Sequence, residues 1–122
     1  FTKAELLTAL AELHVQKGEF EVAQNYVDQA RTANPDLALP WRVQAQIHLS
    51  REHVDKKAIA KALDAYKSYS DRNASDPSGY LERFNLYRKR LEFDKAGEEL
   101  DRIFNIYPKY PNLHYFKGVM LE

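Results

Sequence analysis

A sparse internal repeat is the feature of this sequence that most restricts its fold. Residues 20–35 (FEVAQNYVDQARTANP) and residues 93–108 (FDKAGEELDRIFNIYP) both begin with Phe, have Ala three places later and end on Pro. Few other positions match between the two stretches. A chain that keeps so few positions is repeating a structural unit rather than a local motif.

The two stretches are 73 residues apart, as from Phe20 to Phe93, and this distance is the sum of two shorter shifts. Sliding the sequence by 34 places Leu7 on Trp41, and the same shift places Ala62 on Ala96. Between these pairs the shift is 39, because Trp41 falls on Tyr80. The chain therefore has a period of 34 and one five-residue insertion, which lies within the segment SREHVDKKAIAK.

The kinds of residue that recur predict paired helices. Large apolar residues at i, i+3, i+4 and i+7 form the stripe that a helix buries against its neighbours. Small residues allow two antiparallel helices to approach closely, and a Pro follows a helix that it cannot continue. The small residues expected at these contacts are Ala11, Ala23, Ala45, Ala62 and Ala96.

Seven helices are predicted from this pattern. They cover about residues 3–17, 20–33, 38–51, 55–73, 77–91, 93–106 and 111–121. Asp55 and Asp76 are suitable N-caps for two of them. The insertion either lengthens the fourth helix at its start or enlarges the loop before it. Since each helix pair contacts only its neighbours, we expect an α-helical solenoid.

The whole pattern resembles the tetratricopeptide repeat (TPR) family, whose unit is a 34-residue helix–turn–helix. The resemblance implies a single all-α TPR-like domain of about three and a half repeats over residues 1–122. These repeats would be 4–37, 38–76 with the five-residue insertion, 77–110 and a partial 111–122. The second repeat departs from the family in having Ala74 where the closing Pro belongs. Because the first residue is Phe1 rather than Met, we expect a piece of a longer protein.

Charge and composition exclude several classes of function. Eighteen Lys and Arg residues balance eighteen Asp and Glu residues, so no whole-chain attraction to nucleic acid or acidic membranes is expected. The chain has no cysteine, which excludes thiol catalysis and disulfides. No apolar run approaches the roughly 18–20 residues that span a bilayer, so this segment is not expected to insert into a membrane.

Residues suited to catalysis or metal binding are few. The four histidines show no metal-ligand spacing, and the sequence has no HExxH motif, phosphate-binding Gly loop or G-x-S-x-G. We interpret the histidines as partly buried rings that fill aromatic-sized spaces, with a pH-sensitive helix contact as the alternative. The pairs Glu98–Glu99 and Glu19–Glu21 are expected on exposed helix faces or in loops. The sequence thus predicts no enzyme activity, no cofactor and no metal site.

The TPR resemblance implies a concave groove, lined by the first helix of each repeat, that binds a partner peptide or helix. Carried over by register, the groove residues would be Glu5, Thr8, Glu12, Arg42, Gln46, Leu81, Asn85, Arg88, Lys89 and Tyr115. Their charge changes from acidic in the first repeat to basic in the second and third. The positions that match the chaperone-tail clamp of one TPR subtype hold Thr8, Glu12, Val43, Ser78 and Glu82, so that clamp is absent.

The function favoured by the sequence is a non-catalytic protein–protein interaction scaffold. One alternative is binding of single-stranded nucleic acid by the segment LERFNLYRKRLEF, where aromatic and basic residues alternate. The helical register disfavours it by placing the aromatic residues in the core. Another alternative is a structural spacer or self-association unit with an end-to-end contact through the last helix. Location in the cytoplasm and in a bacterial periplasm are both compatible with the sequence.

Overall fold

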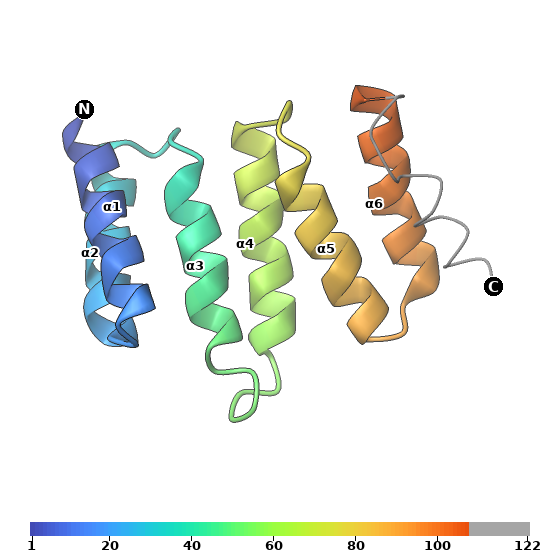
Figure 1. Cartoon of the computed structure of the whole chain (residues 1–122), viewed down its shortest axis with the longest axis horizontal. Coiled ribbons are helices and arrows are strands. Elements are labelled where there is room, and N and C mark those ends of the chain that lie inside the picture. Colours follow the sequence, from blue (N-terminus) through green and yellow to red (C-terminus); the bar gives the residue numbers. More distant parts are fainter. Residues whose placement is uncertain (108–122) are drawn as a thin grey trace. The chain divides into compact units, whose positions relative to one another are not determined.

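Six helices account for most of the described part of the protein, residues 1–107 of a computed structural model (Figure 1). They are α1 (Lys3–Gln16), α2 (Phe20–Ala33), α3 (Leu39–Leu49), α4 (Ala58–Arg72), α5 (Ser78–Lys89) and α6 (Phe93–Ile106). No strand occurs in this range, which confirms the all-α prediction. The predicted helix 111–121 lies outside the described residues.

The chain packs as two compact units that are divided between Asn73 and Ala74. In the first unit α1 pairs with α2 and α3 pairs with α4, while α3 also packs against α1 and α2. In the second unit α5 pairs with α6. Each pair is a helix–turn–helix, as Figure 1 shows. That the whole chain forms one TPR-like domain stays a prediction.

Both units have a small-residue core at the positions that the repeat predicts. The five alanines expected at helix contacts, Ala11, Ala23, Ala45, Ala62 and Ala96, are all fully buried. In the first unit they are joined by Val27, Val43 and Ile47. In the second unit Phe84, Leu100 and Ile103 surround Ala96. The predicted register is thereby confirmed within each unit.

The helix ends follow from local sequence. Thr2 caps α1, because its Oγ1 accepts a hydrogen bond from the Glu5 N–H at 3.2 Å, in the spacing of a capping box. The turn after α1 contains Gly18, whose φ of 78° lets the chain turn back toward α2. The repeat-equivalent residue in the turn after α5 is Leu91, with a φ of 62°. The same turn is therefore built with Gly in one unit and with Leu in the other.

The five-residue insertion enlarges a loop and does not lengthen a helix. α4 begins at Ala58, after the predicted start at Asp55. The Asp55 Oδ1 accepts a hydrogen bond from the Lys57 N–H at 2.9 Å, so Asp55 stabilises the turn before α4. Asp76 does the same before α5 by accepting from the Ser78 N–H at 2.9 Å. Lys57 and Pro77 occupy the N-cap positions themselves, so both N-cap predictions were misplaced.

Overpacking the α3–α4 contact tests this register. Ala62→Leu is expected to lower the free energy of unfolding by about 1–3 kcal/mol, because the added atoms have no room in a fully buried contact. Ala60→Leu is the matched control, since Ala60 is exposed on the same helix and its substitution should change stability by less than about 0.5 kcal/mol. Urea denaturation measures both, and equal effects would contradict the proposed contact.

The turn at Leu91 gives a second test. A non-glycine residue in the left-handed region costs roughly 1–2 kcal/mol, and Leu91 is 73% exposed, so its side chain contributes little burial. Leu91→Gly should therefore stabilise the chain by about 0.5–1 kcal/mol after the greater flexibility of glycine in the unfolded state is counted. Leu91→Ala keeps the Cβ and the strain and should give no such gain. A thermal shift that is the same for both variants would exclude strain at this turn.

Candidate functional site

The first-helix surface of the first unit contains four of the residues predicted from the sequence. Glu5 and Arg42 are exposed, while Glu12 and Gln46 are half-buried. These residues come from α1 and α3, which pack against each other. Glu5 also lies within the N-terminal cap of α1, where its Oε1 accepts from the Thr2 hydroxyl at 3.2 Å. Acidic and basic side chains of neighbouring helices are therefore accessible in this unit.

Thr8 is not part of an accessible surface, and its prediction as a groove residue was wrong. It is fully buried, and its Oγ1 donates a hydrogen bond to the Ala4 carbonyl at 2.7 Å. The reason is its place in the helix, because Ala4, Thr8 and Ala11 form the i, i+4, i+7 stripe that α1 buries. A partner cannot contact this hydroxyl in the folded unit.

The second unit presents the predicted basic residues at the end of α5. Asn85, Arg88 and Lys89 are exposed, and the Arg88 guanidinium lies 5.4 Å from the centroid of the buried Phe84 ring. Leu81 is half-buried and packs against the core of this unit. Tyr115 lies outside the described residues.

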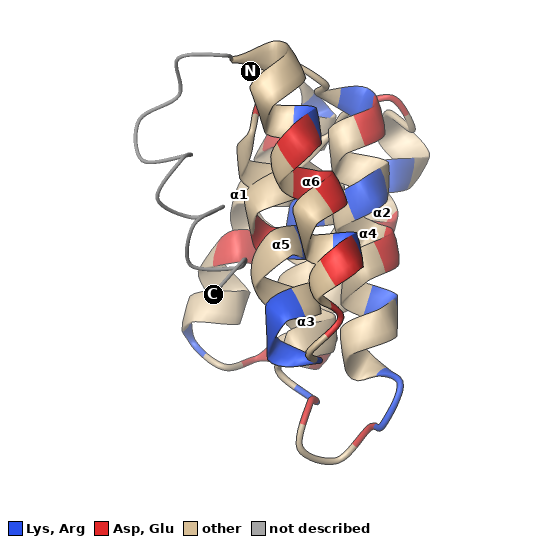
Figure 2. Ribbon diagram, turned by 90° about the vertical axis from the view of Figure 1, so that its right-hand side faces the viewer, with Lys and Arg blue, Asp and Glu red and all other residues tan. Residues whose placement is uncertain are grey.

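The aromatic residues of α5 are used for packing. Phe84 is buried, and the rings of Tyr80 and Tyr87 are packed against the same cluster. Bases stack on accessible rings, so this arrangement weakens the nucleic-acid alternative. Figure 2 shows acidic and basic residues interspersed along the helices that face the viewer.

A groove that the sequence analysis did not predict runs along α3, between α2 and α4. We name it the α2–α4 groove and define it by Gln24, Arg31, Trp41, Gln44, His48, Lys61 and Arg72. It consists of adjoining cavities of about 350 and 470 Å³ that share Arg31 and Trp41. Its residues are spread over three helices and have no common motif, which is why spacing did not reveal it.

The middle of the α2–α4 groove is held by a pair of glutamines. Gln24 Nε2 donates to Gln44 Oε1 at 2.6 Å, and Gln44 Nε2 donates to Gln24 Oε1 at 2.7 Å. Gln44 is only 6% exposed. These reciprocal bonds connect α2 to α3 and satisfy amides that would otherwise be costly to bury.

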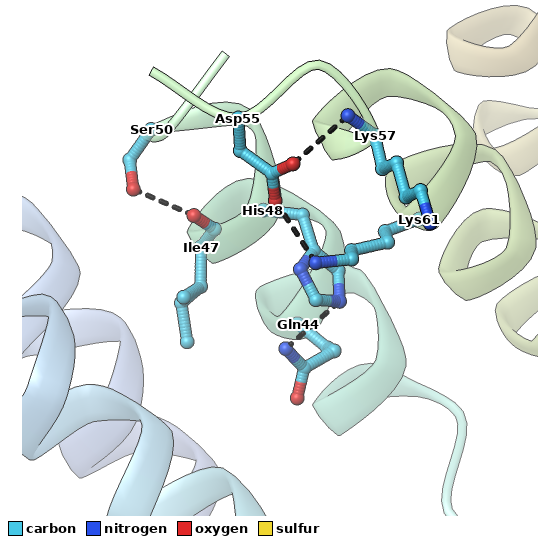
Figure 3. Close-up of polar contacts among 7 residues, drawn as sticks. All are labelled: Gln44, Ile47, His48, Ser50, Asp55, Lys57 and Lys61. Atoms are coloured by element: carbon cyan, nitrogen blue, oxygen red, sulfur yellow. Dashed lines mark hydrogen bonds and ion pairs between the residues drawn. The ribbon is translucent and has the colours of Figure 1, made fainter.

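His48 lies next to Gln44, near the inserted loop (Figure 3). Its Nε2 is 3.2 Å from Gln44 Nε2, which makes an unprotonated ring nitrogen the acceptor. Burial lowers the pKa of His48, and the positive charge of Lys61 acts in the same direction. Asp55 binds Lys61 at 2.9 Å, and this hydrogen bond lowers the pKa of the Asp55 carboxyl. His48 is therefore a packed, neutral ring at pH 7.

His14 has a similar role in the first hairpin. Its ring stacks on Tyr26, with centroids 5.4 Å apart and an interplanar angle of 16°. Its Nδ1 lies 3.3 Å from a carboxylate oxygen of Glu19. Within residues 1–107 no group of three or more potential ligands could hold a metal ion.

The rings of His14 and His48 are partly buried, as the sequence interpretation proposed. His53, in contrast, is exposed in the inserted loop, so the interpretation was wrong there. His114 lies outside the described residues.

A buried carboxylate in the second unit corrects another expectation. Glu99 was expected on an exposed face, but it is 1% exposed. Its Oε1 lies 3.1 Å from Arg83 Nε and 2.8 Å from Arg102 Nη1. Burial raises the pKa of Glu99, while Arg83 and Arg102 act in the opposite direction. The sequence did contain a signal, because Glu99 follows Ala96 at the i+3 position on the buried stripe of α6.

This buried cluster stabilises the helix pair and does not resemble a catalytic acid. The Glu99 carboxylate is enclosed between α5 and α6, and its partner Arg83 has a side chain only 13% exposed. A general acid must come within hydrogen-bond distance of the substrate atom to which it donates its proton, which the burial of Glu99 does not allow. None of the helices within residues 1–107 is long and apolar enough to cross a membrane.

Comparison with known proteins shows the fold. No protein-family model and no curated protein matches the sequence. Among solved structures, the first TPR domain of Spaghetti (RPAP3), bound to the HSP90 peptide SRMEEVD, is 15% identical with a TM-score of 0.74. The match covers 97% of this chain and 92% of that one.

Two further matches agree with it. The Yersinia enterocolitica type III secretion chaperone SycD, in complex with a peptide of the translocator YopD, is 14% identical with a TM-score of 0.68, covering 95% of this chain and 85% of that one. YrrB, described as a TPR protein with an unusual peptide-binding site, is 16% identical with a TM-score of 0.66, covering 97% of this chain and 58% of that one. The protein thus has a TPR-like helical repeat fold.

The buried ion cluster can be tested through Arg83. Arg83→Gln leaves the buried carboxylate of Glu99 with one cation, so we expect the free energy of unfolding at pH 7 to fall by about 3 kcal/mol, the lower part of the range for broken buried pairs. Because the pKa of Glu99 is raised in the folded state, the protonated acid is favoured there. The loss should therefore begin to shrink at a pH above the ordinary value of 4.5, as the pH falls through the raised pKa of Glu99, and should be largely gone below 4.5.

The control for this test is Arg88→Gln on the same helix. Arg88 is exposed, so its substitution should change stability by less than about 0.5 kcal/mol. Chemical denaturation at pH 7 and pH 4 measures both variants. A loss for Arg83→Gln that is independent of pH would show that the ion pair does not stabilise this unit.

Proposed function

We propose that the protein is a non-catalytic interaction scaffold that binds a partner peptide or helix on the surface of its first helices. The observation that carries this proposal is the TPR-like fold, together with solved structures of that fold that hold a peptide. The HSP90 and YopD peptides are ligands of the compared proteins. For this chain they support the class of ligand, a peptide segment, and not its identity.

The proposed surface contains accessible polar residues on α1, α3 and α5. Glu5, Glu12, Arg42 and Gln46 contribute in the first unit, and Asn85, Arg88 and Lys89 contribute in the second. Leu81 is a half-buried apolar contact, and Tyr115 stays in the proposal by register alone. Thr8 is left out because it is buried. Acidic side chains of a partner would have complementary charge to Arg42 in the first unit, and to Arg88 and Lys89 in the second.

The chemistry of this surface differs from a clamp for chaperone tails. Two of the positions that match that clamp, Thr8 and Val43, are fully buried. A third is Glu12, whose negative charge opposes a terminal carboxylate. We therefore propose that the partner binds through internal side chains of an extended or helical segment.

A displayed library of random 12-residue peptides, selected on the immobilised chain, tests this function. We expect enriched peptides that contain acidic residues, and we expect their binding to fall at least tenfold in the triple variant Arg42→Glu, Arg88→Glu, Lys89→Glu. The exposed side chains make a stability loss beyond about 0.5 kcal/mol per site unexpected, and circular dichroism checks the fold.

The control is a triple reversal of exposed cations elsewhere, at Lys56, Lys67 and Lys95. It introduces the same change in net charge and should leave peptide binding unchanged. Loss of binding in this control but not in the first variant would place the interaction on another surface. Failure to enrich any peptide would contradict the proposed function.

A further inference from the structure

We propose that the first unit carries a second binding site, for the carboxylate of an acidic peptide, at the Trp41 end of the α2–α4 groove. The site consists of Arg31 from α2 and Arg72 from α4, both held against the ring of Trp41 on α3. Trp41 and His48 lie along one side of α3, whereas Arg42 and Gln46 lie on another. This site is therefore separate from the first-helix surface proposed above.

The two arginines share one aromatic ring. The guanidinium carbon of Arg31 lies 3.8 Å from the centroid of the Trp41 ring, and that of Arg72 lies 4.8 Å from it. The two charges cannot be farther apart than the sum of these distances, which is comparable with the ~8 Å Debye length at physiological ionic strength. Cation–π attraction holds each arginine in place. The two arginines therefore place two positive charges close together at the ring of Trp41.

Neither arginine forms an ion pair within residues 1–107. No carboxylate oxygen of these residues lies within ion-pair distance of Arg31 or Arg72, unlike Arg83, Arg90 and Arg102, each of which has a Glu partner. Like charges held close together repel, so a bound anion would gain from both guanidinium groups. The folded unit therefore holds two guanidinium groups, unpaired within the described residues, that can bind a negatively charged ligand.

The hydrogen-bond donors of the site are only partly used. Arg72 is fixed in position because its Nε donates to the Pro35 carbonyl at 2.8 Å and its Nη1 donates to the Ser68 carbonyl at 3.1 Å. Its remaining N–H groups stay available, because a guanidinium has five. Arg31 donates to none of residues 1–107, and the buried Nε1 of Trp41 has no partner there either. A carboxylate can accept bidentate bonds from the guanidinium groups.

The cavity is large enough for an acidic side chain, and the charge of its lining suits one carboxylate. It measures about 350 Å³ and is lined by Asp28, Arg31, Thr32, Pro35, Trp41 and Arg72. Two cations and the single carboxylate of Asp28 leave one positive charge in its lining. Asp28 is occupied by a hydrogen bond from Gln24 Nε2 at 2.9 Å. One net charge suits a carboxylate better than a dianionic phosphate.

The rest of the α2–α4 groove suits a peptide chain. The adjoining cavity continues past Arg31 and Trp41 to Gln24. The N–H groups of Gln24 are already used, but its side-chain oxygen has a second lone pair that can accept from a peptide N–H. α3 has 11 residues, so at 1.5 Å per residue it is about 16 Å long, the span of roughly five extended residues. No run of cations follows the groove, as a nucleic acid would require. An acidic peptide is thus the ligand that fits best.

Trp41 is the only tryptophan of the chain, so its fluorescence reports on this site directly. We expect blocked pentaglutamate to give a saturable change in Trp41 emission, and pentaglutamine to give none. Arg31→Gln should raise the Kd for pentaglutamate at least tenfold, and Asp28→Asn should lower it two- to threefold by removing the opposing charge. Lys67→Gln is the matched control, because Lys67 is an exposed cation on α4 outside both proposed surfaces, and it should leave the Kd unchanged.

The outcomes distinguish this site from the first-helix surface. Arg31 makes no hydrogen bond to other described residues, so Arg31→Gln should fold normally, and circular dichroism verifies this. Absence of a saturable signal, or equal affinity in Arg31→Gln and the wild type, would overturn the proposal. Tighter binding of inorganic phosphate than of pentaglutamate would overturn the assignment to peptide. If only the charge-reversal variant of Arg42, Arg88 and Lys89 lost the library-selected peptides, that surface would stand without this site.

Discussion

The close approach of paired helices at alanine is the contact on which the rest of the structure depends. Five alanines, one or two in each hairpin, are fully buried where two helices meet. A larger side chain at such a position would push the axes apart and separate the apolar stripes that pack around it. The same contact brings α2 and α4 to either side of α3, and so it forms the groove with Trp41 at one end.

Equivalent positions of the first and second repeats differ in burial, so the same position in the repeat can be buried in one and exposed in the other. In α3, Pro40, Gln44 and Ile47 are buried, and Gln44 bonds across to α2. Their equivalents in the first repeat are Leu6, Leu10 and Leu13, which are all exposed on α1. Helix α2 packs against the side of α3 that holds Gln44. Among the described residues, no helix packs in the same way against Leu6, Leu10 and Leu13 of α1. One register therefore produces a buried polar contact in one repeat and an exposed apolar stripe in the other.

Arginine serves three physical roles in the described part of the chain. Arg83 and Arg102 neutralise a buried carboxylate, so they belong to the core of the second unit. Arg31 and Arg72 stack on Trp41 without a carboxylate partner, and this leaves donors facing a cavity. Arg42 and Arg88 are exposed on first helices. Only the first role makes a charge unavailable to ligands, which is why a net charge of zero still allows two cationic surfaces.

The sequence by itself determined the repeat period, the pairing of helices, the buried alanines and the approximate helix bounds, because these depend on periodicity and side-chain size. It also located the insertion, although not that Asp55 would hold it as a loop. Tertiary structure decided the environment of individual polar residues. Thr8 and Glu99 are polar residues on otherwise apolar stripes, and their burial depends on partners such as Ala4 and Arg83. The stacking of two arginines on Trp41 could not be predicted from the sequence either. The three side chains come from three different helices and meet only after the hairpins pack.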